Sequence, residues 1–595
     1  MTRTSFRTIR GPFPTSPQDP HQGIPMQGGI VVEFGRADAI ATGLAAARGG
    51  VAGLATGGAS GRDLIALSAD GGAIAALRLW SGGPVTTDTL RALPVSPGPG
   101  EPALVVLPTG VVICAPGADH LLRLPPAPWG TATPEVLGLG GLRVAGPATA
   151  LPDGRLAVAV SGGGAAIIDP SAAGGAVHAI LPLLADTTVA EWQDPGLARG
   201  ITALDAVALA GGGVRLVAAV GGAERVIAYD IGPSGAIAFP RQIGAAEGVA
   251  LGDAAALATV TRGDATLAIV AGQGSDTLAV LEFGADGHER VRDQVMDTRD
   301  LRLGQVSVVR AIDAMGTTFV LAGGAEAGLS LFALGPDARL YHLATTGAVP
   351  GAEFGSLADL AVIADGGTLQ VAAARQGAPE VIHLAVDLSE LGSIGGTLQG
   401  ETLRGTARDD IVIATHSARR LEGGTGADLF VFGPDVADAG GFLGSVADFE
   451  PEIDRLDLSG FALLYGRDGV SIAATADGAR ISLRDRWLDL RSADGQPLDP
   501  VAFSDRDLVE GLHLPWIPAV APPVFEPRGP SGWQPSVPGP ELPDPPHRDI
   551  ALFAFSPESA PAWGARAYAD WVGFVPQPLA PPEAAAIAAQ FALLM

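Results

Sequence analysis

Lysine and asparagine are both missing from the 595 residues, so all 37 basic side chains are arginine. Without lysine, the chain has no Walker-type phosphate loop, no Schiff-base lysine and no lysine general base. Without asparagine, it has no acceptor for N-linked glycans. Cys114 is the single cysteine, which excludes an intrachain disulfide and a zinc site built from cysteines. These absences remove several large classes of enzyme and of small metal-binding domain.

Positive charge and long apolar runs are also scarce. The chain carries 64 acidic and 37 basic side chains, a formal net charge of −27, whereas proteins that bind nucleic-acid phosphates need a basic surface. No apolar run reaches the length of about 18 residues that a membrane-spanning helix requires. Residues 1–29 contain three arginines and lack the apolar core of a secretory signal peptide. We therefore expect no nucleic-acid partner and no membrane span.

Small residues are abundant instead. The chain contains 83 glycines and 48 prolines, and 47% of it is hydrophobic although only 5% is aromatic. This apolar fraction is too high for a disordered chain. The composition favours many short strands joined by glycine turns.

A long-period repeat occupies the region from about residue 60 to 390. Three closely similar segments recur at intervals of 51 residues, and a fourth follows after 52. Their anchor residues are Gly221, Gly272, Gly323 and Arg375. Looser copies lie around Ser68, Pro116 and Ser161. The repeat therefore has seven units of roughly 45–60 residues.

Each unit has the pattern of four short strands. In the unit that begins at 266, strands are expected at 266–271, 277–283, 288–296 and 306–312, separated by glycine turns. Four strands per roughly 40–50 residues are typical of one β-propeller blade. We predict a seven-bladed β-propeller over 51–390. The pattern resembles the lactonase-like and surface-layer propellers.

After the last of these units the period changes to nine residues. Four nonamers follow without a gap from residue 396 to residue 431. The eighth position of each is apolar, namely Leu403, Val412, Leu421 and Phe430. The last nonamer, Gly-Gly-Thr-Gly-Ala-Asp-Leu-Phe-Val, fits the calcium-binding nonapeptide of RTX proteins.

The residues after the nonamers extend this resemblance. The segments 426–432 and 446–459, which contain Asp-Phe and Asp-Arg-Leu-Asp-Leu-Ser, resemble the end of the RTX roll in serralysin-type secreted proteins. The resemblance implies a short parallel β-roll over 391–505, closed by capping strands. A capping hairpin is expected from 470–475 and 479–483 around Asp477-Gly478.

The same resemblance implies a Ca²⁺ site. Two nonamers complete one turn of such a roll, so residues that are 18 apart stack on one side. Asp410 and Asp428 are 18 apart and are expected to share one ion, with main-chain carbonyls completing the oxygen ligands that Ca²⁺ prefers. The predicted metal site consists of Gly405, Ala407, Asp410, Gly423, Thr425 and Asp428.

Two further expectations concern positions beside this site. Asp409 occupies the fifth position of its nonamer, which is not a ligand in the family pattern, and is expected to point to solvent. The equivalent sixth positions on the opposite side of the roll are Glu401 and Arg419. Because an arginine repels Ca²⁺, we expect no ion on that side.

Catalytic motifs are missing from the chain. The serralysin protease motif His-Glu-x-x-His is absent, because His288-Glu289 is followed by Arg-Val-Arg. There is no Gly-x-Ser-x-Gly nucleophile elbow, and no two of the nine histidines stand at metal-ligand spacing. We therefore predict no catalytic residue.

Proline dominates a stretch near the end of the chain: 12 of the 32 residues from 515 to 546 are proline, which is typical of an extended spacer. The expected organisation is an N-terminal, partly disordered arm (1–50), the propeller (51–390), the calcium-binding roll (391–505), a Pro-rich linker (506–550) and a C-terminal segment (551–595). By its position, this last segment is a candidate type I secretion signal.

The leading hypothesis is an all-β, non-enzymatic, calcium-binding RTX protein that is secreted or displayed on a bacterial cell surface. Its propeller would serve as a platform for a protein or glycan ligand, and its export would use type I secretion machinery. Two alternatives stay open. One is a lactonase-like hydrolase with its site in the propeller channel, and the other is a structural component of a surface or virion-like assembly.

Overall fold

In the computed structural model of the chain, the residues described are 30, 32–35, 38–42, 50–57, 63–78, 86–93, 102–126, 133–161, 164–172, 174–181, 200–238, 240–349, 352–437, 441–461, 464, 466–508 and 513–514. The candidate secretion signal over 551–595 and residues 515–550 of the Pro-rich linker lie outside these ranges.

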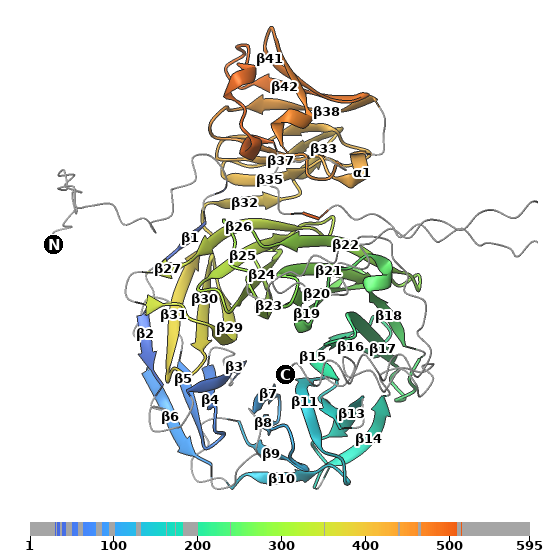
Figure 1. Cartoon of the computed structure of the whole chain (residues 1–595), viewed down its shortest axis with the longest axis vertical. Coiled ribbons are helices and arrows are strands. Elements are labelled where there is room, and N and C mark those ends of the chain that lie inside the picture. Colours follow the sequence, from blue (N-terminus) through green and yellow to red (C-terminus); the bar gives the residue numbers. More distant parts are fainter. Residues whose placement is uncertain are drawn as a thin grey trace, which may run out of the picture. The chain divides into compact units, whose positions relative to one another are not determined.

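Seven antiparallel sheets form a ring, each contributing one blade (Figure 1). Blades 1 to 3 consist of β3 (Val51–Gly57), β4 (Asp63–Ser68), β5 (Ala73–Arg78) and β6 (Thr86–Ala92); β7 (Ala103–Leu107), β8 (Gly110–Cys114), β9 (His120–Leu124) and β10 (Glu135–Gly138); and β11 (Val144–Ala150), β12 (Leu156–Val160), β13 (Ala165–Asp169) and β14 (Ala176–Leu181). Blades 4 to 6 consist of β15 (Ile201–Ala208), β16 (Val214–Val220), β17 (Arg225–Ile231) and β18 (Arg241–Gly244); β19 (Ala254–Arg262), β20 (Ala265–Gly272), β21 (Thr277–Phe283) and β22 (Glu289–Met296); and β23 (Val306–Ala314), β24 (Thr317–Gly324), β25 (Leu329–Leu334) and β26 (Leu340–Thr346). The prediction of a seven-bladed propeller is confirmed.

The seventh blade is built from both ends of the propeller sequence. Its inner strands are β29 (Leu357–Asp365), β30 (Thr368–Arg375) and β31 (Glu380–Asp387). The short strands β1 (Glu33–Phe34) and β2 (Asp38–Ala41) both pair antiparallel with β31 and complete the sheet. Residues 33–34 and 38–41, which the sequence placed in an N-terminal arm, therefore belong to the propeller.

The core lies between neighbouring blades. The first strands of successive blades contact one another around the ring, and β29 contacts β3 to close it. The middle strands are covered on both faces, and all seven residues of β16 and of β21 are buried. This explains why these strands are mostly apolar and lack the alternation of a half-buried strand, although Arg215 in β16 and Glu282 in β21 are buried as well.

The repeat unit predicted from 266 is displaced by one strand relative to the blade. Its first three strands correspond to β20, β21 and β22, but its fourth corresponds to β23, which begins the next blade. The missing strand is β19. Hairpin signals locate strands along the chain, but they do not show which strand lies innermost.

Strands that pair in parallel follow the propeller and form what we call the C-terminal strand domain (391–508). Its elements are β32 (Leu391–Ile394), β33 (Thr397–Gln399), β34 (Thr402–Arg404), β35 (Asp409–Ile413), β36 (Arg420–Glu422), β37 (Leu429–Val431), α1 (Pro434–Ala437), β38 (Gly441–Phe449), β39 (Arg455–Asp457), β40 (Ser471–Thr475), β41 (Gly478–Leu483) and β42 (Arg486–Ser492). One parallel sheet has the order β32-β35-β37-β39, and the other contains β34-β36-β38-β42. None of the helices in the described ranges is long and apolar enough to span a bilayer.

The parallel pairs bring together residues that are 18 apart. Leu403 lies opposite Leu421 and Val412 opposite Phe430. All four are buried in one apolar cluster between the sheets, as their shared nonamer position requires. The hairpin predicted around Asp477-Gly478 is present as β40 and β41.

Candidate functional site

Two stacked turns hold most of the predicted calcium ligands. The turn 405–408 precedes β35, and the turn 423–427 precedes β37. Because β35 and β37 are neighbours in one parallel sheet, the two turns lie at the same end of it. The turns bring together Gly405, Asp410, Gly423 and Asp428. The other two predicted ligands, Ala407 and Thr425, lie exposed in the same turns.

Buried carboxylates connect successive turns, and we call them the carboxylate ladder (Asp410, Asp428 and Asp454). The main-chain N–H of Asp410 donates to Asp428 Oδ1 at 2.9 Å, and that of Asp428 donates to Asp454 Oδ1 at 3.0 Å. The three residues are at most 3% exposed. Each carboxylate thus accepts the N–H of the preceding aspartate in the ladder. This gives the buried N–H groups the hydrogen-bond acceptors that they need.

Asp410 already has partners for both of its carboxylate oxygens. Oδ1 accepts from the main-chain N–H and the hydroxyl of Ser393. Oδ2 accepts from the N–H of Thr406 at 2.7 Å and from its hydroxyl at 2.9 Å. A carboxylate with four such bonds has little remaining capacity for a cation. Asp410 therefore holds the turns in place, and Asp428 is the stronger candidate ligand.

Burial is the main reason why the pKa of Asp428 is raised to about 7, and the nearby carboxylates of Asp410, Asp448 and Asp409 raise it further. Burial likewise raises the pKa of Asp454 to about 8. A carboxylate in this condition gains from any partner that neutralises it, either a proton or a cation.

The space around the two glycines has the oxygen donors that Ca²⁺ prefers. A side-chain carbon on Gly405 would overlap the carbonyl oxygen of Gly423 and the carboxylate of Asp410. One on Gly423 would overlap the carboxylate of Asp428. The donor set is therefore hard and anionic, which suits Ca²⁺. Within the described ranges, no three His, Cys, Asp or Glu side chains converge to hold a metal ion, so a cation here would depend on main-chain carbonyls as well.

Two aspartates beside the ladder differ from what the sequence predicted. Asp409 was expected to point to solvent, but this is wrong: it is partly buried, and its Oδ1 accepts from the N–H of Ala427 at 2.8 Å. Asp448 was not predicted at all. Its two oxygens accept from the N–H groups of Gly423 and Gly424, both at 3.0 Å, and so fix the lower turn.

Asp454 was not predicted as part of the site, because it does not follow Asp428 at the 18-residue spacing of the nonamers. It follows Asp428 by 26 residues, and β37 pairs with β39 at the same spacing. The extra eight residues accommodate α1 and the start of β38. On the opposite side, the guanidinium of Arg419 donates to the carbonyl oxygen of Phe442 at 3.0 Å. Whether that side holds an ion stays a prediction.

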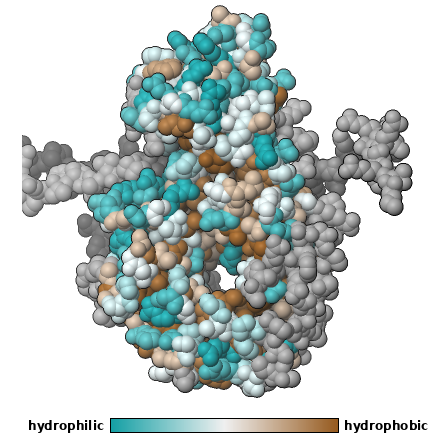
Figure 2. All heavy atoms as spheres, turned by 180° about the vertical axis from the view of Figure 1, so that it is seen from behind, coloured by the Kyte–Doolittle hydropathy of each residue, from teal (hydrophilic) through white to brown (hydrophobic). Residues whose placement is uncertain are grey.

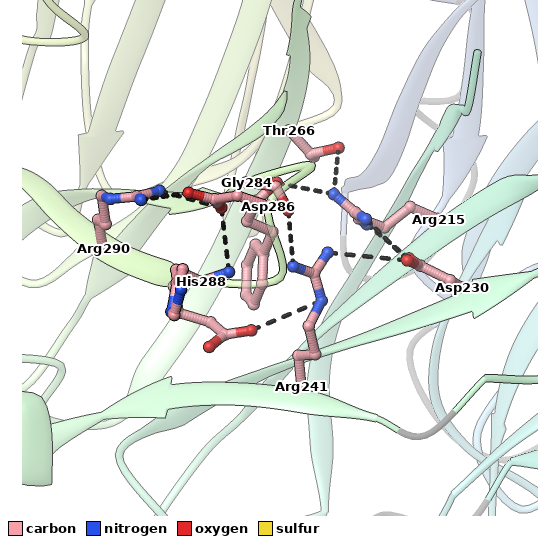
Figure 3. Close-up of polar contacts among 10 residues, drawn as sticks. Arg215, Asp230, Arg241, Thr266, Gly284, Asp286, His288 and Arg290 are labelled. Atoms are coloured by element: carbon pink, nitrogen blue, oxygen red, sulfur yellow. Dashed lines mark hydrogen bonds and ion pairs between the residues drawn. The ribbon is translucent and has the colours of Figure 1, made fainter. Parts of the chain in front are cut away.

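The propeller has its own charged clusters, and the one between blades 4 and 5 is shown in Figure 3. Arg215, of which 4% is exposed, donates to both oxygens of Asp230 at 2.6 and 2.7 Å and to the carbonyl of Phe283 at 2.8 Å. Arg241 donates to the carbonyl of Gly284 at 2.8 Å. His288 enters the cluster through its main chain: its N–H donates to Asp286, and its carbonyl accepts from the N–H of Gly284 at 2.9 Å. The contacts of Arg215 and Arg241 with Phe283 and Gly284 join the blades.

Charged residues on the inner strands have the same role. The carboxylate of Asp359 in blade 7 accepts from the N–H of Leu54 in blade 1 at 2.8 Å and from Arg310 in blade 6. Asp205 in blade 4 accepts from the N–H and hydroxyl of Thr259 in blade 5 at 2.7 and 2.8 Å. These side chains are engaged between blades. Figure 2 shows, from behind, an opening at the centre of the ring.

Comparisons with known proteins add little to this geometry. No family model matches the chain, and no curated protein matches its sequence. Among solved structures, the chain is similar to Kuenenia stuttgartiensis hydrazine synthase, with 14% identity, a TM-score of 0.38, and coverage of 56% of this chain and 95% of that one. The assignment of the propeller accordingly depends on its own strands.

Proposed function

We propose that this protein is a secreted or cell-surface calcium-binding protein of the RTX type, with a non-enzymatic β-propeller as its interaction platform. The carrying observation is the stack of Asp410 and Asp428, in which a main-chain N–H of one turn donates to the carboxylate of the next at 2.9 Å. The Gly-Gly-x-Gly-x-Asp nonamer at 423–431 supplies the lower of these turns.

In this proposal the residues of the two turns have different roles. Asp428 is the anionic ligand, because its carboxylate is buried and borders the space left by Gly423. Main-chain carbonyls of the two turns complete the oxygen set. Asp410 and Asp448 orient the turns through their bonds to main-chain N–H groups. A bound Ca²⁺ would supply the positive charge that the buried carboxylates lack.

The proposal also explains the acidic, lysine-free composition. A chain with a net charge of −27 repels itself where Ca²⁺ is scarce, and it gains a folding partner where Ca²⁺ is abundant. This suits export in an unfolded state followed by folding outside the cell. The export machinery would be of type I, and the platform's partner a protein or a glycan.

Calcium titration of the full chain by calorimetry tests this function. The wild type is expected to bind at micromolar to millimolar Ca²⁺, and Asp428→Ala to weaken binding about 100-fold or more because it removes the anionic ligand. Asp485→Ala is the matched control, since it removes the same charge from a side chain that is 79% exposed in the same domain. The proposal would be contradicted if the wild type gave no heat of calcium binding. It would also be contradicted if Asp428→Ala and Asp485→Ala bound calcium equally well.

A further inference from the structure

A buried ionic cluster joins the propeller to the C-terminal strand domain. We call it the joint cluster (Asp293, Arg339, Asp457 and His513). Asp293 lies on β22 of blade 5, Arg339 directly precedes β26 of blade 6, and Asp457 ends β39. The four side chains are at most 5% exposed.

Arg339 is at the centre of the joint cluster. Its Nε lies 3.8 Å from Asp293 Oδ1, its Nη1 lies 3.6 Å from Asp457 Oδ2, and its Nη2 donates to the hydroxyl of Ser459 at 3.0 Å. The Nδ1 of His513 lies 2.7 Å from Asp293 Oδ1. One guanidinium thus contacts carboxylates from two parts of the chain. Its removal would leave the buried carboxylate of Asp457 without this cation and would leave Asp293 with His513 as its partner, which is strongly destabilising.

The joint cluster is continuous with the carboxylate ladder through β39. Asp454 directly precedes this strand and accepts the N–H of Asp428, while Asp457 ends the strand and faces Arg339. β39 also pairs in parallel with β37, which begins immediately after Asp428. Only Arg455 and Leu456 therefore separate the carboxylate ladder from the joint cluster along the chain.

Apolar packing supports the same connection. One buried cluster contains Ile411 and Leu429 of the C-terminal strand domain together with Phe354 and Leu388 from the end of the propeller. The two apolar residues from β35 and β37 directly follow Asp410 and Asp428 in the chain. An opening of the turns would therefore disturb side chains that complete the core of blades 6 and 7.

We propose that a cation at Asp428 regulates the propeller: the turns at 405–431 and the outer strands of blades 5 and 6 open and close as one unit, with Arg339 as the positioning residue that couples them. This inference rests on the proposed function for its cation, but the coupling itself is a property of the fold. The part of the propeller that responds to calcium would be the edge nearest the joint cluster.

Hydrogen–deuterium exchange of the full chain, in EGTA and in Ca²⁺, tests the coupling. At Ca²⁺ about 100 times the Kd, amides that exchange through a calcium-linked opening are expected to slow about 100-fold. In the wild type this slowing should occur both in 405–431 and in β26. In Arg339→Met it should persist in 405–431 and fall below about threefold in β26.

Arg215→Met is the matched control. Arg215 is an equally buried arginine that joins blades 4 and 5, away from the joint cluster. Its loss should leave the calcium response of β26 as in the wild type. An equal response of β26 in Arg339→Met and Arg215→Met would overturn the role of Arg339.

The remaining outcomes separate this inference from the proposed function. Slowing in 405–431 without any in β26 of the wild type would overturn the coupling and leave the calcium site standing. Slowing in neither region would reject calcium binding, and the coupling would then be decided by Asp454→Ala in EGTA. That variant removes the acceptor for Asp428 N–H. Faster exchange in both regions would support coupling, and faster exchange in 405–431 alone would overturn it.

Discussion

Replacing Gly423 with alanine is expected to abolish calcium binding and to lower the free energy of unfolding by about 1–3 kcal/mol, the usual cost of overpacking. The added methyl group would overlap the carboxylate of Asp428 and would also lie 2.9 Å from Cζ of Phe430. Both neighbours are buried: Asp428 is 1% exposed and Phe430 is fully buried. Calorimetric titration and urea unfolding of the full chain measure the two effects.

Gly367→Ala is the control for this substitution. A methyl group there would have no heavy atom within 4 Å, and the backbone of Gly367 is not in the left-handed region. Its effect is expected to be neutral or stabilising by about 0.4–1 kcal/mol, through the entropy of the unfolded chain. A Gly423→Ala protein as stable as the wild type, with calcium binding intact, would show that the space between the turns is not the cation site.

Without calcium, the protein is expected to be more stable at pH 5 than at pH 8. The pKa values of Asp428 and Asp454 are raised to about 7 and about 8 in the folded state, above their usual 3.8. As the pH rises from about 4, the unfolded chain loses these protons first, so the folded state is progressively destabilised up to the folded pKa. Each carboxyl costs at most about 1.4 kcal/mol per pH unit across this window. Calcium should remove most of the loss.

Thermal unfolding in EGTA and in Ca²⁺ at both pH values measures this effect. The net charge also disfavours the folded state at high pH, so Asp454→Asn serves as the comparison. It removes one titrating group and keeps an oxygen that can accept from Asp428 N–H. The fall in melting temperature from pH 5 to pH 8 should be smaller in Asp454→Asn than in the wild type. Identical falls would mean that the ladder does not titrate in this range.

The propeller could be predicted because its repeat is carried by local signals. Four strands, glycine turns and a period near 51 residues fix the number of blades, and the count of seven is confirmed. The identity of the innermost strand could not be predicted, since it depends on contacts between β19 and β23 across blades. The two N-terminal strands were missed because they are only two and four residues long.

The candidate site was predictable only where spacing is regular. The stack of Asp410 and Asp428 follows from the nonamer period, whereas Asp454 stands 26 residues beyond Asp428 and lies outside that period. The joint cluster has no local signal. Arg339 and Ser459 are 120 residues apart, and His513 and Asp293 are 220 apart, so only the folded chain brings them together.

The pairing of β1 and β2 with β31 has a consequence for the order in which the chain folds. The hydroxyl of Thr42 donates to the carbonyl of Pro379 across 337 residues, and no shorter segment can make that contact. Six blades can assemble from neighbouring hairpins, but the sheet of the seventh blade is complete only when the beginning of the chain meets strand β31. Joining such distant segments is a slow, entropically costly event in folding. The pairing of β1 and β2 with β31 is therefore expected to be a late step in folding.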